Sequence, residues 1–120
     1  MKILRFLFCL SFFLFVSAQS FAELVRFFES IQDVPLMNGL SERIDETITF
    51  DKPDGRVVES VAEVHGVSVE SVRQYYVTAL PQFGWQHSGQ DRFLRGHESL
   101  ELVFENHGGF DVMRVLIRPR

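Results

Sequence analysis

Cysteine is nearly absent from this sequence of 120 residues. The one cysteine, Cys9, lies in an apolar run near the N-terminus and lacks the small residues that precede a lipoprotein cleavage site. A lipid anchor is therefore not expected, and the rest of the chain can form neither a disulfide nor a thiolate site. Its stability has to come from a hydrophobic core alone.

Basic residues are also scarce. The chain has 12 Lys and Arg against 16 Asp and Glu, a formal net charge of −4, and no segment carries a basic stripe. Contacts from Lys and Arg to phosphate supply most of the affinity for nucleic acids, and similar charges hold proteins on anionic lipids. The composition therefore excludes nucleic acid as a partner and charge-driven binding to a membrane surface.

A long apolar run occurs once, at the N-terminus. Two basic residues precede an apolar run over residues 6–16, and small and polar residues follow it as far as Ala22. This order is typical of a secretory signal peptide, with cleavage after Ala18 or, as we prefer, after Ala22. The run is shorter than the roughly 20 residues of a membrane span, so we expect no stable span after cleavage. An exported chain without disulfides is typical of the bacterial periplasm, which is the predicted location.

Removal of residues 1–22 would leave 98 of the 120 residues, with 10 basic and 16 acidic side chains and a net charge of −6. A chain of this length forms one domain with one core. We divide it into an N-terminal arm, residues 23–45, and a single domain, residues 46–120. The sequence shows no repeat and no low-complexity tract.

Residues 67–85 form the stretch around which the domain is organised. Ser68 suits a helix N-cap, because its hydroxyl can accept from an N–H group that has no partner within the first turn. Apolar side chains then recur at intervals of three and four, which predicts a helix with one buried face. They are Val69, Val72, Tyr76, Ala79, Leu80 and Phe83. Gly84 suits the left-handed position after the helix, and Trp85 is predicted as a buried anchor.

Six segments have the pattern of β-strands. They are residues 47–50, 56–65, 83–88, 92–95, 100–105 and 110–118. The valines of the second segment fit a helix or a strand, and the preceding Asp-Gly turn favours a strand that completes a hairpin. Ser60 and Ala62 stand at the centre of one face of this strand, where we expect the helix to approach closely.

The predicted order of elements is β-β-α-β-β-β-β. Strands joined by short turns should form an antiparallel sheet of about five to six short strands, with the one main helix packed across a face. The predicted fold class is α+β, a two-layer sandwich.

The N-terminal arm has two interpretations. Four apolar residues have the spacing of one or two helical turns, and the Val-Pro pair after them requires extended backbone. These four are Leu24, Phe27, Phe28 and Ile31. The arm could pack on the domain and close its core, or it could be an exposed docking surface, since exposed apolar patches mark contacts. The members of that surface would be Phe27, Phe28, Leu36 and Met37.

Several motifs resemble a group of small exported proteobacterial proteins of unknown function. They are V-P-L-M-x-G-L at residues 34–40, G-R-V-V-E at 55–59, and a helix ending with Tyr75-Tyr76, Leu80-Pro81 and Phe83-Gly84-Trp85. Together they cover most of the chain after the signal peptide. The resemblance implies export and a compact α+β domain, but it implies no reaction, cofactor or site residue, because the group has no assigned activity.

The histidines do not form a metal-binding motif. The four lie 22, 10 and 10 residues apart, intervals that match no ligand pattern, so we predict neither a metal site nor a cofactor. The predicted strands place His87 and His107 near one end of the sheet and His97 near the other.

Two pairs of glutamates lie four residues apart on single strand faces. General acid–base catalysis needs carboxylates that converge on a cleft and differ in pKa. Here the solvated face of a strand explains each pair better than catalysis does. The pairs are Glu59 with Glu63 and Glu101 with Glu105.

Tyr75 is the helix residue best suited to a contact outside the core. It lies about 100° around the helix from Tyr76, so the two cannot both be central core residues. The candidate binding residues are Phe27, Phe28 and Tyr75, and the candidate structural residues are Ser68, Tyr76, Leu80, Gly84 and Trp85.

The leading functional hypothesis is a non-enzymatic periplasmic protein, an interaction or accessory module with a protein partner in the cell envelope. The alternative is a small-molecule-binding domain with a pocket between the helix and the arm, and a small hydrolase ranks third. A pocket of about 300 Å³ or more with converging polar groups would favour the second or the third hypothesis.

Overall fold

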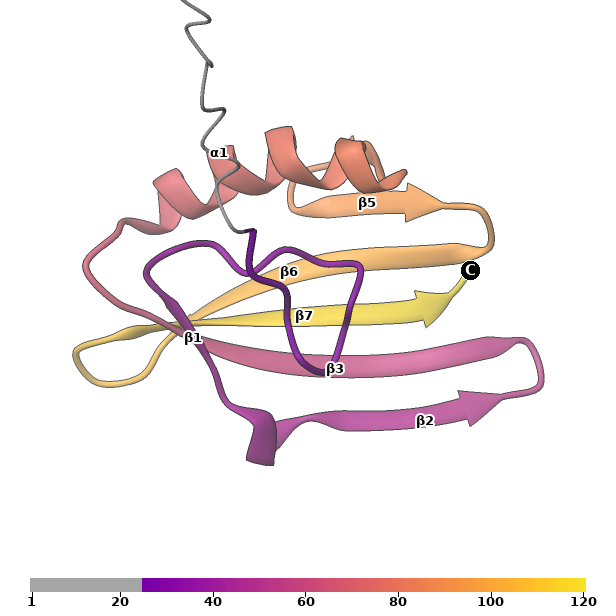
Figure 1. Ribbon diagram of the computed structural model, residues 1–120, viewed down its shortest axis with the longest axis horizontal. Helices are drawn as coiled ribbons and strands as arrows, with labels where there is room; N and C mark the ends of the chain where they lie inside the picture. The colour runs from indigo at the N-terminus through magenta and orange to yellow at the C-terminus, as the bar shows by residue number, and fades with distance from the viewer. Residues whose placement is uncertain (1–24) are drawn as a thin grey trace, which may run out of the picture.

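The computed structural model describes residues 25–120, and the predicted signal peptide with both of its cleavage sites lies outside the described residues. In the described part, a seven-stranded antiparallel sheet has one α-helix packed across one face (Figure 1). The predicted α+β class, with an antiparallel sheet and one main helix, is confirmed. The sheet has seven strands rather than five or six, and the order differs because a short strand precedes the first predicted one.

The strands are β1 (Leu40–Glu42), β2 (Ile48–Lys52), β3 (Gly55–Val64), β4 (Gln86–Gly89), β5 (Arg92–Arg95), β6 (Glu98–Asn106) and β7 (Asp111–Pro119). Their spatial order is β1-β3-β7-β6-β5-β4, and β2 also pairs with β3. β1 and β2 lie one after the other along the same edge of β3, separated by a short 3₁₀ helix, η2 (Ile44–Glu46). The unexpected strand, β1, is three residues long and lies in the predicted arm.

The helix α1 (Val69–Ala79) begins at the predicted cap. The Ser68 hydroxyl accepts a hydrogen bond from Ser71 N at 3.0 Å. Glu70 lies in the first turn, where the helix dipole favours a negative charge. Val72 and Tyr76 are fully buried, so the predicted apolar face does meet the core.

The helical segment extends to Phe83, into the start of the strand predicted over residues 83–88. A 3₁₀ helix, η3 (Leu80–Phe83), continues α1, and Gly84 closes it at φ +88°. Glycine enters this left-handed region readily because it has no Cβ. The predicted strand 83–88 therefore started too early, since Phe83 is still helical and β4 begins after Trp85.

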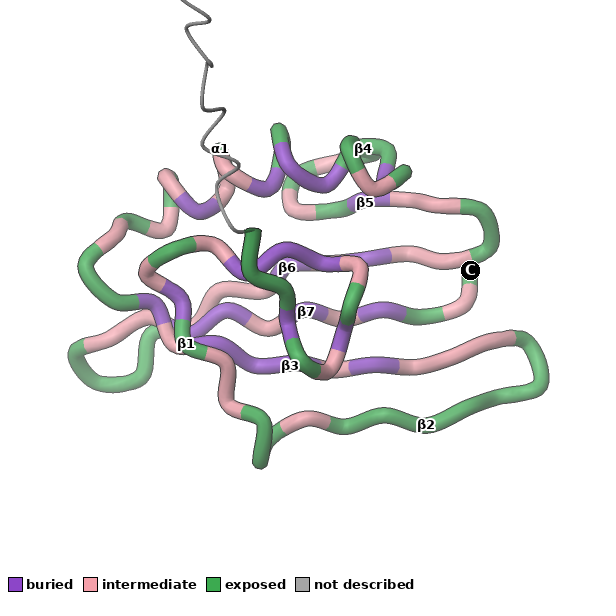
Figure 2. The backbone as a smooth tube through the Cα atoms, in the orientation of Figure 1, coloured by how far each residue is buried: buried purple, intermediate pink, exposed green. Residues whose placement is uncertain are grey.

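One face of the sheet carries the core. Buried segments of β3, β6 and β7 lie side by side in the middle of the sheet (Figure 2). Paired residues of antiparallel strands share a face, and the buried residues of these three strands largely do so. On the core face they are Val58, Ser60, Ala62, Val64, Leu100, Leu102, Met113, Val115 and Ile117.

The arm closes this core beside α1. Residues 25–31 contain no helical turn, so the prediction of helix there was wrong, because the chain folds back on itself. Leu24 lies outside the described residues. Phe28 N donates to Val34 O at 3.0 Å, and Phe27 forms a bridge with Pro35. The side chains of four arm residues face inward, with exposed fractions of 9% or less: Phe28, Ile31, Val34 and Leu36.

Ser60, one of the small residues of β3, contacts the arm. The Ser30 hydroxyl lies 2.5 Å from the hydroxyl of Ser60, which is fully buried. Glu42 accepts hydrogen bonds from the backbone of Glu29 and from Ser30, so β1 holds the same turn of the arm. The expected close approach at Ser60 does occur, but its partner is the arm.

Candidate functional site

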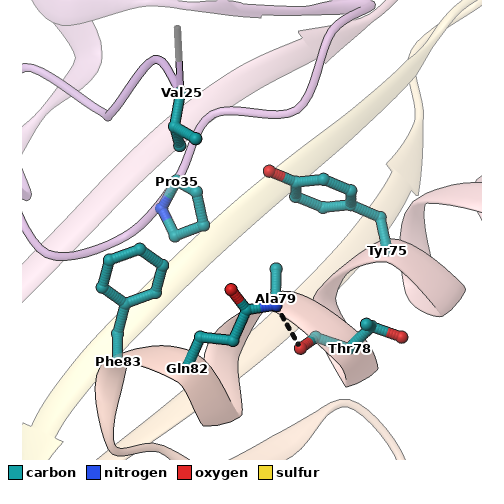
Figure 3. Close-up of a pocket in the computed structure, with 7 residues that line it drawn as sticks. All are labelled: Val25, Pro35, Tyr75, Thr78, Ala79, Gln82 and Phe83. Atoms are coloured by element: carbon teal, nitrogen blue, oxygen red, sulfur yellow. Dashed lines mark hydrogen bonds between the residues drawn. The ribbon is translucent and has the colours of Figure 1, made fainter. Parts of the chain in front are cut away.

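A groove lies between the helical segment and the arm (Figure 3). The volume of the groove is about 250 Å³, and the arm supplies Val25 and Pro35 to its lining. The helical segment supplies side chains spaced by three and four residues, which places them on one face. They are Tyr75, Thr78, Ala79, Gln82 and Phe83.

The lining of the groove is mostly apolar. The rings of Tyr75 and Phe83 lie on opposite sides of it, with Pro35 between them in the view of Figure 3. None of the seven described lining residues carries a formal charge. The polar side chains among the lining residues are Tyr75, Thr78 and Gln82, and the side-chain nitrogen of Gln82 donates to the backbone oxygen of Thr78 at 3.3 Å. The groove can therefore bind an apolar group and offer hydrogen bonds at its rim.

Tyr76 holds the arm against the helical segment on the two sides of the groove. Its hydroxyl donates to Pro35 O at 2.7 Å and accepts from Met37 N at 3.5 Å. The ring packs edge-on against Tyr75, with 5.0 Å between centroids. Burial raises the pKa of Tyr76 well above its ordinary value, so the hydroxyl keeps its proton and remains a donor to the arm.

Two of the three candidate binding residues meet at the groove. Tyr75 lines it directly. Phe27 is 39% exposed, and its ring packs edge-on against Phe83 at a centroid distance of 5.4 Å. Phe28, in contrast, is 1% exposed and lies in the core, so it contributes nothing to this surface.

The remaining groove residues were missed in the sequence. Thr78 and Gln82 lie three and seven residues after Tyr75, so helical spacing could have placed them beside it. Val25 and Pro35 give no such signal, because their positions depend on how the arm folds back.

The candidate structural residues lie in or next to the core. Tyr76, Leu80 and Trp85 are fully buried, while Ser68 caps the helix and Gly84 ends the helical segment. The guanidinium carbon of Arg95 lies 4.1 Å from the ring centroid of Trp85, a cation–π contact.

Arg95 belongs to a cluster of four charged residues at one end of the sheet. It lies 2.5 Å from Asp33 of the arm and 3.2 Å from Glu98. Arg56 lies 2.7 Å from Glu98 and 3.5 Å from Asp33, so two cations and two carboxylates alternate. Arg95 also donates to the carbonyl oxygen of Phe83 at 3.1 Å, which connects this cluster to a residue that lines the groove.

The cluster lowers the pKa of both of its carboxyl groups. Partial burial opposes ionisation of Asp33, but the hydrogen bond from Arg95 and the charges of Arg95 and Arg56 outweigh it. Glu98 has the same balance, with burial opposed by hydrogen bonds and charge from Arg56 and Arg95. Both carboxylates therefore stay ionised at neutral pH, and Asp33 attaches the arm to Arg56 and Arg95 of the sheet.

The paired glutamates of the free sheet face are bound to arginines. Arg114 lies 2.8 Å from Glu59 and 3.1 Å from Glu105, and Arg43 forms an ion pair with Glu63. The Arg43 hydrogen bond is the main reason that the pKa of Glu63 is low, and the His107 hydrogen bond is the main reason for Glu105. A general acid at neutral pH needs the opposite shift. The pKa values of Glu63 and Glu105 are therefore shifted away from the value that a general acid needs.

The histidines lie apart from one another. His87 pairs with Phe93, whose other partner is Leu100 near the start of β6, while His107 follows the end of β6. The expectation that His87 and His107 share one end of the sheet was wrong, because β4 is short and pairs far from that turn. Among residues 25–120, no three His, Cys, Asp or Glu side chains come close enough to hold a metal ion. The same part of the chain contains no helix with the length and apolarity of a membrane span.

Comparison of the chain with known protein families, with curated proteins and with solved structures finds no match.

Proposed function

We propose that this protein is a non-enzymatic interaction module of the cell envelope, and that its groove receives an apolar side chain of a partner protein. The observation that carries the proposal is the size and lining of the groove. At about 250 Å³ it is smaller than the roughly 300–1,000 Å³ pockets that enclose small molecules. An apolar side chain with a short stretch of backbone fits such an open site better than a whole metabolite does.

The composition of the groove agrees with a protein partner. Aromatic side chains dominate the binding energy of protein interfaces, and Tyr75, Phe83 and the adjoining Phe27 gather here. Thr78 and Gln82 add polar side chains to the lining, to which the backbone of a bound peptide segment would bond. The lack of a charged lining residue favours an apolar anchor on the partner rather than an ionic one.

The envelope location rests on the sequence. The predicted signal peptide would export the chain, and the resemblance to small exported proteins points the same way. A partner in the periplasm or on the membrane surface would meet the groove after export.

Site-specific photocrosslinking in cells tests the proposal. A photoreactive amino acid at Gln82, which lines the groove, should give one discrete adduct with a protein. The matched control is Gln74, an exposed glutamine of α1 outside the groove. Thr78→Phe, which fills the groove from an exposed position, should abolish the adduct and leave the melting temperature unchanged.

Three results would contradict the proposal. Equal adducts at both glutamines would mean that the helix contacts proteins without selectivity. If neither position gave an adduct, the proposal of a protein partner at this groove would be refuted. A small molecule that copurifies with the wild type but not with Thr78→Phe, seen by native mass spectrometry, would favour the small-molecule alternative.

A further inference from the structure

The edge strand β2 stands apart from the rest of the sheet. All five of its residues are exposed, and Figure 2 shows it as a continuous exposed strand along one side of the molecule. Ile48 is 52% exposed and Phe50 is 47% exposed. These two alternate positions share the face of the sheet that points away from α1 and the arm. An exposed apolar edge strand is a template for pairing with another strand.

The pairing of β3 shows which backbone groups of β2 point outward. Arg43 N donates to Val61 O, so the odd-numbered residues of β3 direct their backbone groups toward the edge occupied by β1 and β2. Ile48 and Phe50 pair with odd-numbered residues of β3 and therefore bond inward. Thr49 and Asp51 consequently direct their N–H and C=O groups away from the sheet, where a further strand could bond to them.

We propose that β2 pairs antiparallel with β2 of a second copy of this chain, with the twofold axis at Thr49. In this register Ile48 lies opposite Phe50 of the second copy, and the pair occurs twice. Glu46 is the last residue of η2 and pairs with Arg43 of its own chain at 2.9 Å. In this register it would also lie on the side of Lys52 of the second copy, again twice. The edge is thus complementary to itself in both its apolar and its charged side chains, as a twofold interface requires.

A neighbouring register fits less well. With the axis at Phe50, each Ile48 would face a Lys52 ammonium group, and Glu46 would lie on the side of Asp54 of the second copy rather than Lys52. The Thr49 register joins apolar with apolar and acid with base. The interface is small, so we expect a weak dimer of the kind formed by contacts below about 1,200 Å². This proposal does not depend on the groove.

Sedimentation velocity over a range of protein concentrations tests for the dimer. The purified chain without its signal peptide should shift from monomer to dimer as its concentration rises. Thr49→Pro removes the outward N–H on the axis and should weaken dimerisation at least tenfold. Proline is tolerated there because this N–H has no partner in β3, so the Trp85 fluorescence and the melting curve should match the wild type.

Engineered disulfides test the register. After removal of the signal peptide the chain has no cysteine, so each variant carries only the thiol introduced. Directly paired residues lie within disulfide range, about 4.4–6.8 Å between Cα atoms. Thr49→Cys should therefore form a disulfide-linked dimer under mild oxidation. Asp51→Cys, which is equally exposed on the same strand, should not.

Each other outcome overturns a defined part of the proposal. If the chain stays monomeric at every concentration, the proposed dimer does not form and the proposal is refuted. A dimer that survives Thr49→Pro uses another surface. A disulfide in Phe50→Cys but not in Thr49→Cys places the axis at Phe50 and refutes the register.

Discussion

The substitution Tyr76→Phe isolates the contact that holds the arm to the helix. It removes one oxygen atom and keeps the ring, so the packing of the core is preserved. The Tyr76 hydroxyl donates to Pro35 O at 2.7 Å in a buried hydrogen bond. The variant therefore leaves a buried carbonyl oxygen without its partner.

The cost follows from the burial of that carbonyl. An unsatisfied buried acceptor costs about 1–3 kcal/mol, so we expect Tyr76→Phe to lose about 2 kcal/mol. In a domain of this size, 1 kcal/mol corresponds to about 4–8 °C in melting temperature, which predicts a decrease of about 8–16 °C. Tyr75→Phe is the matched control on the same helix and should cost less, because Tyr75 is partly exposed.

Urea denaturation followed by circular dichroism and by the fluorescence of Trp85, the one tryptophan of the chain, measures both variants. The wild type should also lose stability above about pH 10, where tyrosine ionises in the unfolded chain while burial keeps Tyr76 protonated in the fold. Tyr76→Phe should lack this alkaline loss. Equal stabilities for Tyr76→Phe and Tyr75→Phe would refute the role given to the hydroxyl.

Further substitutions test the core and the charged cluster. Trp85→Ala should cost about 3–5 kcal/mol, because the side chain is fully buried, while Trp85→Phe should cost clearly less; a melting curve of Trp85→Ala close to that of the wild type would show that Trp85 is not an anchor. Asp33 and Glu98 have lowered pKa values in the fold, so their contribution to stability is present above about pH 4 and is lost as the pH falls through those lowered values. Asp33→Asn should therefore be less stable than the wild type at neutral pH and should depend less on acid, as urea titrations between pH 2 and 7 would measure. Parallel acid curves for the two proteins would mean that Asp33 takes no part in this dependence.

Local patterns predicted the elements whose partners are close in sequence. β6 and β7 follow from the alternation of Leu100 and Leu102 with polar residues and from the tight turn between the strands. The helix was predicted from Ser68 and from the apolar residues after it, whose spacing shows which face of the helix is buried. These signals are strong because each residue is fixed by neighbours on its own element.

The arm could not be predicted in the same way. Its apolar residues have helical spacing, but the hydrogen bond from Phe28 N to Val34 O and the position of Pro35 favour a folded-back loop. β1 was missed because three residues give no alternation to detect. One wall of the groove, with Tyr75, was visible in the helix pattern, while the wall that contains Pro35 depends on contacts with distant parts of the chain.

The attachments of the arm also set the order in which the protein can fold. Ser30 contacts Ser60, Pro35 contacts Tyr76, and Asp33 contacts Arg95, across 30, 41 and 62 residues of chain. Each contact closes a long loop, and the entropy of closure must be overcome before the contact forms. The first described segment to be synthesised is therefore among the last to find its place. We therefore expect folding to be slow and to occur in a single step. A truncated chain that ends before β5 should not form a closed core.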